Sequence, residues 1–375
     1  MPNPHVFTGD PYFHSLQKNI QASLILFHSF IRIFALNKPP ENTIMAKYKE
    51  YGYDIQNGKA IIPEWETEIK EGAFVVCKEL TSVELPQWIK KIGKQAFYGC
   101  ENLTDITLPE WVEEIGEYAF YGCKNLKSIT LPRWLKKIGE WAFYGCSSLT
   151  SISIPPSVTE IGGWAFFGCS SLTSITIPPS VTEIGKYAFK DCSSLTSITI
   201  PPSVTKIGEE TFRGCSSLTS IAIPPSVTMI GEYAFFGCSS LTTIAIPESV
   251  TKIGENAFKD CSNLTSVSIP PSVTEIAKSA FDSCSSLTSI TVSKDNKVYD
   301  SREDCNAIIH TESNTLIRGC ENTIIPPIGD DDLGLCFQSL LQPHERLHPT
   351  IGDGDWGVML SLVAPASRAS PSHHR

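Results

Sequence analysis

Ten cysteines recur at a fixed interval of 23 residues, and their thiols are the side chains in this chain that are best placed to do chemistry. The repeating cysteines are Cys77, Cys100, Cys123, Cys146, Cys169, Cys192, Cys215, Cys238, Cys261 and Cys284. Thirteen cysteines in 375 residues would ordinarily indicate a disulfide framework or a metal site. The fixed interval instead indicates a tandem repeat in which each of these ten thiols occupies an equivalent position.

Equivalent side chains in stacked repeats point the same way, so we expect these thiols to pack as a column of small apolar groups. Neighbouring Cα atoms in such a column would lie about 5 Å apart, within the disulfide range, but parallel side chains cannot readily adopt the dihedral angle of a disulfide. Cys305, Cys320 and Cys336 lie outside the column, and a bridge between the first two remains open. The cysteines therefore predict core packing and leave the redox compartment undecided.

Histidine, the residue used most often as a catalytic base and a common zinc ligand, does not occur in the repeats. The eight histidines are His5, His14, His28, His310, His344, His348, His373 and His374. The chain contains no nucleophile elbow, P-loop, dinucleotide-binding fingerprint or His-Glu-x-x-His motif. We therefore predict that the protein is not an enzyme and that it uses no cofactor and no metal ion.

The repeat unit predicts the elements that position these residues. In the unit that begins at Cys169, the alternation over 175–177 predicts a short strand with one buried face. The two prolines at 178–179 lack backbone donors, so the strand must end there and the chain must turn. Gly185 then opens a turn or 3₁₀-like segment whose Ala188 and Phe189 are expected to point inward.

A unit of this length cannot bury its own apolar face, so we expect successive units to stack with parallel strands about 4.8 Å apart. The predicted strands run from Leu80–Leu85 and Leu103–Leu108 to Leu287–Val292 and would form one long parallel sheet. The predicted fold class is therefore mainly β: a solenoid with short strands and turn or 3₁₀ segments in each 23-residue coil.

The pattern Leu-x-x-Ile-x-Ile, followed by Pro-x-x-Val-x-x-Ile-Gly and Ala-Phe-x-Gly-Cys, resembles the BspA-type leucine-rich repeat. The resemblance covers about 60–292, and the stretch 305–326 is similar to an insert that recurs between repeats of the same family. It implies a leucine-rich repeat module that binds a protein or a glycan, of the adhesion or surface-antigen type, located at the cell surface or secreted. The alternative is an intracellular leucine-rich repeat scaffold for protein–protein interaction.

The chain divides into four expected parts. Residues 1–45 do not repeat, 46–292 form the solenoid, 293–327 form a β-rich end element, and 328–375 read as a disordered tail. The apolar stretch 22–36 is too short to span a membrane and lacks the features of a convincing signal peptide, so Met45 is a candidate start. We also expect the last coil to lack a polar cap.

The net charge of −10, with no column of Lys or Arg, argues against a nucleic acid as partner. Two aromatic columns are candidates for contact with a protein or glycan. In the first, Trp65, Trp88, Trp111 and Trp134 occupy the position that holds serine in later coils. A packed core would not accept both side chains, so the indoles are expected to be partly exposed. They form either an apolar strip for a partner or a cover for the first coils that packs against the N-terminal segment.

The second column flanks the inward phenylalanine of each coil. It reads either as an adhesive surface or as amphipathic side chains that lie over the edge of the solenoid. Its members are Tyr118, Trp141, Trp164, Tyr187 and Tyr233, together with Tyr98, Tyr121, Tyr144, Phe167 and Phe236. The serine and threonine side chains on the outward face of the sheet read as a soluble β surface.

Overall fold

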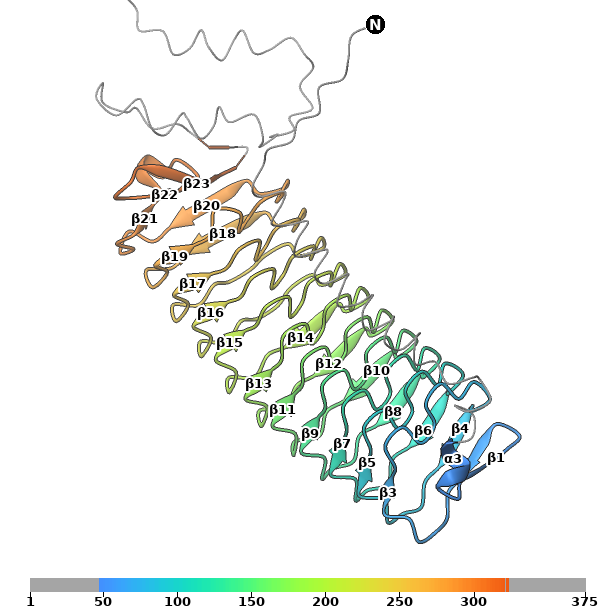
Figure 1. The fold of residues 1–375 in the computed structure, drawn as a ribbon. Helices are drawn as coiled ribbons and strands as arrows, with labels where there is room; N and C mark the ends of the chain where they lie inside the picture. The colour runs from blue at the N-terminus through green and yellow to red at the C-terminus, as the bar shows by residue number, and fades with distance from the viewer. Residues whose placement is uncertain (1–46, 321, 324–375) are drawn as a thin grey trace, which may run out of the picture.

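Each 23-residue unit forms one coil of an elongated solenoid, in which successive coils lie side by side along the long axis (Figure 1). The computed structural model describes residues 47–320 and 322–323. Two parallel sheets run along the solenoid, and the predicted mainly β fold is confirmed. Within the described residues, no helix is long and apolar enough to cross a membrane.

In most coils the first sheet forms from a triplet that places a β-branched residue between polar residues, with the central side chain buried. Neighbouring strands pair in register, so that Ile152 lies opposite Ile129 and Ile175. Its strands are β1 (Asp54–Gln56), β2 (Lys59–Ile61), β4 (Ser82–Glu84), β6 (Asp105–Thr107), β8 (Ser128–Thr130), β10 (Ser151–Ser153), β12 (Ser174–Thr176) and β14 (Ser197–Thr199). Strand β1 is antiparallel to β2, whereas the later pairings are parallel.

The first sheet is not the single continuous sheet that the sequence predicted. After β14 it continues through isolated bridges at Ala222 and Ala245, and strand pairing resumes between β18 (Ser266–Ile269) and β20 (Ser289–Val292). Alanine is depleted in strands, and these two coils carry it where their neighbours have serine or threonine.

A second parallel sheet lies where only turns were predicted. It forms from two-residue strands that lie just before the glycine position of each coil. In each strand a polar residue or a methionine precedes a buried isoleucine. The strands are β3 (Glu68–Ile69), β5 (Lys91–Ile92), β7 (Glu114–Ile115), β9 (Lys137–Ile138), β11 (Glu160–Ile161), β13 (Glu183–Ile184), β15 (Lys206–Ile207), β16 (Met229–Ile230), β17 (Lys252–Ile253) and β19 (Glu275–Ile276). Pairing is interrupted once, between β13 and β15.

One buried phenylalanine per coil forms the phenylalanine column, the centre of the core. Neighbouring rings stack nearly parallel, with centroids 5.2–5.7 Å apart. The column consists of Phe74, Phe97, Phe120, Phe143, Phe166, Phe189, Phe212, Phe235, Phe258 and Phe281. In the segment that carries this ring, every second amide donates to the carbonyl three residues before it, such as Ala188 to Gly185 at 3.3 Å, and the amides between donate to the next coil, as Phe189 does to Thr211 at 3.0 Å. The segment is therefore a series of turns, one of the two forms that the sequence predicted.

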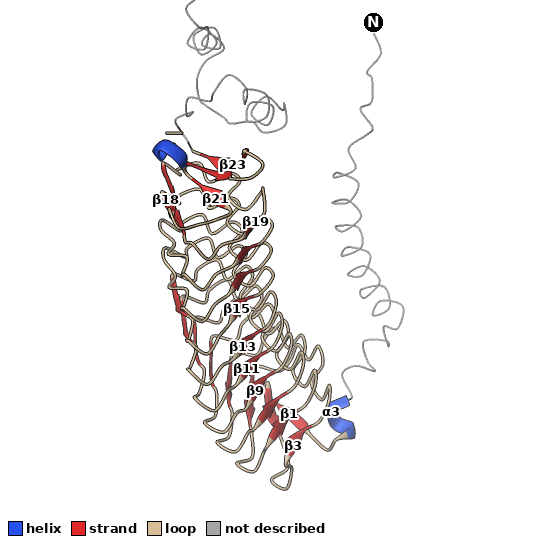
Figure 2. Cartoon of the chain, turned by 90° about the vertical axis from the view of Figure 1, so that its left-hand side faces the viewer, coloured by secondary structure: helices blue, strands red, loops and turns tan. Residues whose placement is uncertain are grey.

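Both ends of the described solenoid are covered, as Figure 2 shows. At the first end, helix α3 (Lys47–Glu50) precedes β1, and the rings of Tyr48 and Tyr53 stack on Phe74. At the other end, β21 (Tyr299–Asp300), the 3₁₀ helix η1 (Arg302–Asp304), β22 (Ala307–His310) and β23 (Thr315–Gly319) form a small antiparallel element. Ile308 of β22 packs into the main core, so this element covers the last described coil. The expectation that the repeat ends without a polar cap concerned the chain after residue 327, which lies outside the described residues. The expectations for 1–45 and 328–375 lie outside the described residues.

Candidate functional site

The tryptophan strip (Trp65, Trp88, Trp111 and Trp134) is held at the corner between the two sheets. Each indole is the third residue of a β-turn that begins with proline, as in the bond from the Leu135 amide to the Pro132 carbonyl at 3.1 Å. The proline ends the first-sheet strand, and the residue after the tryptophan returns the chain to the core. The indoles therefore project outward from four successive coils at a spacing of about 4.8 Å.

These four indoles are exposed, as their replacement by serine in later coils predicted. Trp65 is 80% exposed and Trp88, Trp111 and Trp134 are 47–55% exposed; Ile61 is the one other large apolar side chain in the described residues that is comparably open. A run of exposed apolar side chains on one edge is the usual feature of a contact surface.

The serines of the later coils show what the fold would gain without the indoles. The hydroxyl of Ser157 donates to the Leu135 carbonyl at 2.6 Å, and the same bond recurs in the coils that follow. Trp134 has no hydroxyl, so the equivalent carbonyl, that of Val112, lacks this donor. A hydrogen bond of this kind contributes about 1 kcal/mol. Trp88, Trp111 and Trp134 therefore each have exposed apolar surface at a position where serine would form a hydrogen bond to the preceding coil.

Paired charges border the strip. The guanidinium of Arg133 lies 5.4 Å from the ring centroid of Trp134 and forms an ion pair with Glu110. Lys136 and Glu113 form a second ion pair at 3.3 Å. An open cavity of about 380 Å³ lies between Trp111 and Trp134, with Glu113 and Lys136 completing its lining. Because both charges of each pair are present, this part of the strip has apolar faces and a polar rim without net charge.

The second aromatic column forms two internal stacks and is not an open surface. Tyr98, Tyr121, Tyr144 and Phe167 stack with centroids 4.5–4.6 Å apart, and their half-burial raises the pKa of both Tyr98 and Tyr121 to about 12. A second stack consists of Tyr118, Trp141, Trp164 and Tyr187, with spacings of 4.3–5.6 Å. The ring faces contact each other, so only the edges remain for a partner. Tyr233 lies apart from both stacks, beside Phe236 and Arg213.

The cysteine column is buried, as predicted. Each thiol from Cys100 onward donates a hydrogen bond to the carbonyl of the phenylalanine 26 residues earlier, at 2.9–3.2 Å. Burial raises the pKa of all ten thiols, to about 11 for Cys77 and about 12 for Cys238. The nucleophilic thiolate is therefore disfavoured. Cys305 and Cys320 are free thiols, so the bridge considered between them is not formed.

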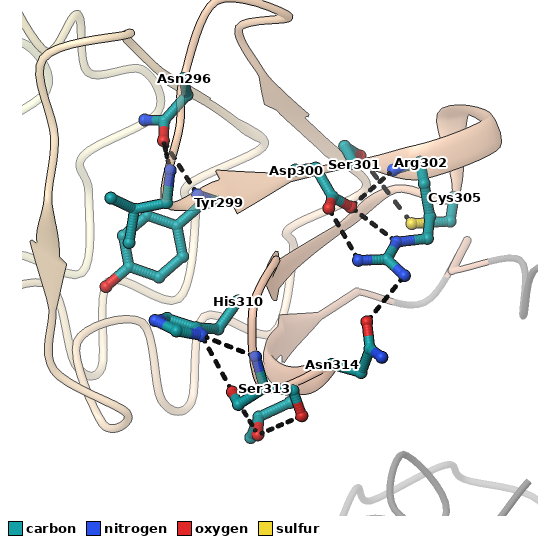
Figure 3. A network of polar contacts seen from close by, with 11 residues as sticks. Asn296, Tyr299, Asp300, Ser301, Arg302, Cys305, His310, Ser313 and Asn314 are labelled. Atoms are coloured by element: carbon teal, nitrogen blue, oxygen red, sulfur yellow. Dashed lines mark hydrogen bonds and ion pairs between the residues drawn. The ribbon is translucent and has the colours of Figure 1, made fainter. Parts of the chain in front are cut away.

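A cluster of polar side chains around His310, the histidine among the described residues, organises the end element (Figure 3). The Nδ1 atom of His310 accepts the Ser313 amide at 3.2 Å and lies 2.9 Å from the Ser313 hydroxyl, which fixes the turn between β22 and β23. Arg302 is bound by Asp300 and Asn314. These contacts are local to the hairpin. No group of three or more histidine, cysteine, aspartate or glutamate side chains in the described part of the chain is arranged to hold a metal ion.

Asn296 attaches this element to the last coil, a role that was missed from the sequence. Its amide nitrogen donates to the carbonyls of Pro270 and Val273 at 2.8 and 3.0 Å. Its oxygen accepts the amides of Val298 and Tyr299, each at 2.9 Å. The available signal was positional: residue 296 lies 23 residues after Val273, so a buried asparagine stands where the next coil would have placed valine.

Comparison with known proteins places this geometry in context. Residues 67–196 and 182–305 match the BspA type leucine rich repeat region, a pattern of six copies. A leucine rich cell surface protein from Faecalibacterium prausnitzii is 32% identical over 62% of this chain and 78% of its own, with a TM-score of 0.40. The leucine rich repeat protein of T. pallidum is 29% identical over 52% and 88%, with a TM-score of 0.36. The pneumococcal vaccine antigen PcpA is 20% identical over 62% and 75%, with a TM-score of 0.33. No curated protein matches the chain.

Proposed function

Because this chain belongs to the BspA-type leucine-rich repeat family, we propose that it is a non-enzymatic module that binds a protein or a glycan through its tryptophan strip. The observation that carries the proposal is the exposure of Trp65, Trp88, Trp111 and Trp134, at a position where later coils use serine for an internal hydrogen bond. Large aromatic anchors supply most of the binding energy of many interfaces.

The strip suits an uncharged or weakly charged face of the partner. Its ion pairs are satisfied within the chain, so a partner gains contact mainly from the indole faces and from hydrogen bonds at the rim. Rigid coils hold the indoles in place before binding, which reduces the entropy lost when the complex forms. The adhesion role belongs to this proposal and requires the strip to face the outside of a cell.

The experiment is a binding screen of the purified chain on a glycan array and on immobilised extracellular matrix proteins. The same screen is run with a variant in which Trp88, Trp111 and Trp134 are replaced by serine, the residue of the later coils. We expect the wild-type chain to bind at least one probe and the variant to lose that signal. Binding that survives in the folded variant, or no binding to any probe in the screen, contradicts the proposal.

A further inference from the structure

The second sheet is interrupted at one place, between β13 and β15, although these strands are neighbours on the same face of the solenoid (Figure 1). On either side of this junction the strands pair without a break, β3 to β13 on one side and β15 to β19 on the other. The repeat is nearly identical in these coils, so a local cause is needed.

Two inter-coil hydrogen bonds are missing at the junction. The first belongs to the threonine column: the Thr182 amide donates to Thr159 at 3.0 Å, and the Thr228 amide donates to Thr205 at 2.9 Å. Between them, the Thr205 amide donates to no described residue. The threonine hydroxyls follow the same pattern. The Thr182 and Thr228 hydroxyls donate to backbone carbonyls of the preceding coil, and the Thr205 hydroxyl has no such bond to a described residue.

The second missing bond belongs to the glycine column. The Gly185 amide donates to Ile161 at 2.8 Å, and the Gly231 amide donates to Ile207 at 2.9 Å. The Gly208 amide has no such acceptor in the part of the chain that is described. An unpaired amide at this point has to be exposed to water, because a buried one would be costly.

The coils are also farther apart here. A Cβ atom added to Gly162, Gly231 or Gly254 would lie 2.6–2.8 Å from the backbone of the preceding coil, so only glycine permits that approach. At Gly208 the nearest backbone atom would be 3.9 Å away. The gap is therefore about 1 Å wider than in the neighbouring coils, and Gly208 is partly exposed where Gly231 is buried.

Thr211 is the cause that the sequence offers. The other nine coils carry a buried alanine at this position, whereas Thr211 is 1% exposed and adds two heavy atoms. Its hydroxyl donates to the Gly208 carbonyl at 3.0 Å, the acceptor that the alanine amide uses elsewhere, as in Ala234 to Gly231. Extra volume in a packed interior moves the adjacent backbone.

The two coils remain hydrogen-bonded across this junction at the turn that follows the second sheet. The Phe189 amide donates to Thr211 at 3.0 Å. Glu210 there forms ion pairs with Lys190 at 2.6 Å and with Arg213 at 3.1 Å, and these side chains are largely covered. The phenylalanine column remains continuous, although its widest spacing, 5.7 Å, lies between Phe189 and Phe212. A junction that is open on one face and held on the next has the geometry of a hinge.

We propose that the solenoid flexes at the junction between β13 and β15, so that it consists of two stiff arms, of which the first carries the tryptophan strip. Flexing changes the angle between the arms without breaking either core, because each coil contacts only its neighbours. The proposal is independent of what the strip binds, since it depends only on the coil that contains Thr211.

The test compares two exchanged residues. Thr211→Ala gives this coil the residue of the other nine, and Ala234→Thr gives the next coil the substitution found here. Hydrogen exchange is measured at single amides by mass spectrometry. In the wild-type protein we expect the amides of Thr205 and Gly208 to exchange at least roughly tenfold faster than those of Thr228 and Gly231.

Thr211→Ala should slow exchange at Thr205 and Gly208 to the level of their neighbours. Ala234→Thr, which keeps Thr211, should leave these two amides fast and add fast exchange at Thr228 and Gly231. A second readout is the distance distribution between spin labels attached through a ketone amino acid at Lys137 and Lys252, on opposite sides of the junction. Thr211→Ala should narrow the distribution of distances between the two labels. Equal protection of all four amides in the wild-type protein, or no effect of Thr211→Ala on exchange and on the distribution, overturns the proposal.

Discussion

Removing one ring from the middle of the phenylalanine column should be among the most damaging single substitutions in the chain. Phe166 is fully buried and stacks on Phe143 and Phe189, with both centroids 5.5 Å away. Phe166→Ala removes that buried area and leaves a cavity, which together cost about 3–5 kcal/mol. Because two stacked neighbours lose contact at once, we expect a loss in the upper half of that range, about 4–5 kcal/mol.

The last ring of the column is the matched comparison. Phe281 is equally buried but stacks on one ring only, Phe258, with the centroids 5.2 Å apart. Phe281→Ala should therefore cost less than Phe166→Ala, about 3–4 kcal/mol. Both free energies of unfolding come from urea titrations followed by circular dichroism, compared at an unchanged m-value. A loss below about 2 kcal/mol for Phe166→Ala, or a larger loss for Phe281→Ala, would refute the account of the core.

Three further predictions concern the thiols, the end element and the ion pairs of Glu210. Burial raises the pKa of the ten column thiols above their ordinary value of about 9, so the stability that the protonated thiols contribute is complete below pH 9. As the pH rises further this contribution is lost, at about 1.4 kcal/mol per thiol and pH unit. A urea midpoint that stays constant from pH 7 to 10.5 would contradict this. Asn296→Ala should speed hydrogen exchange in β21–β23, because four bonds to that side chain are lost; unchanged exchange would show that the element is held otherwise. Glu210→Ala should cost about 1–3 kcal/mol by leaving Lys190 and Arg213 unpaired, and the loss should shrink in 1 M salt; a loss independent of salt would exclude the ionic explanation.

The repeat determined most of what could be predicted from the sequence. Identical spacing of Ile175, Phe189 and Cys192 in every coil implies stacking, a shared core and buried thiols, and these predictions are confirmed. The second sheet was missed because two residues, such as Glu183–Ile184, are too few to show an alternating pattern.

The exposed surface was harder to predict. Exchange of tryptophan for serine correctly indicated exposure of the strip, because that difference in volume cannot be accommodated in a core. The same reasoning did not reveal that Trp141 and Trp164 stack face to face, since their contacts are made between coils and not within one. The effect of Thr211 likewise depends on packing against Gly208, which spacing alone does not show.

The most direct test of the central claim is the affinity of the triple variant, in which Trp88, Trp111 and Trp134 become serine, for a probe that the wild-type chain binds. The control carries Thr130, Thr176 and Thr199 replaced by serine on the exposed face of the first sheet. If the indoles are anchors, the dissociation constant should rise at least roughly thirtyfold in the variant, the equivalent of about 2 kcal/mol, and stay unchanged in the control. Equal affinities of the folded variant, the control and the wild-type chain would contradict binding through the tryptophan strip.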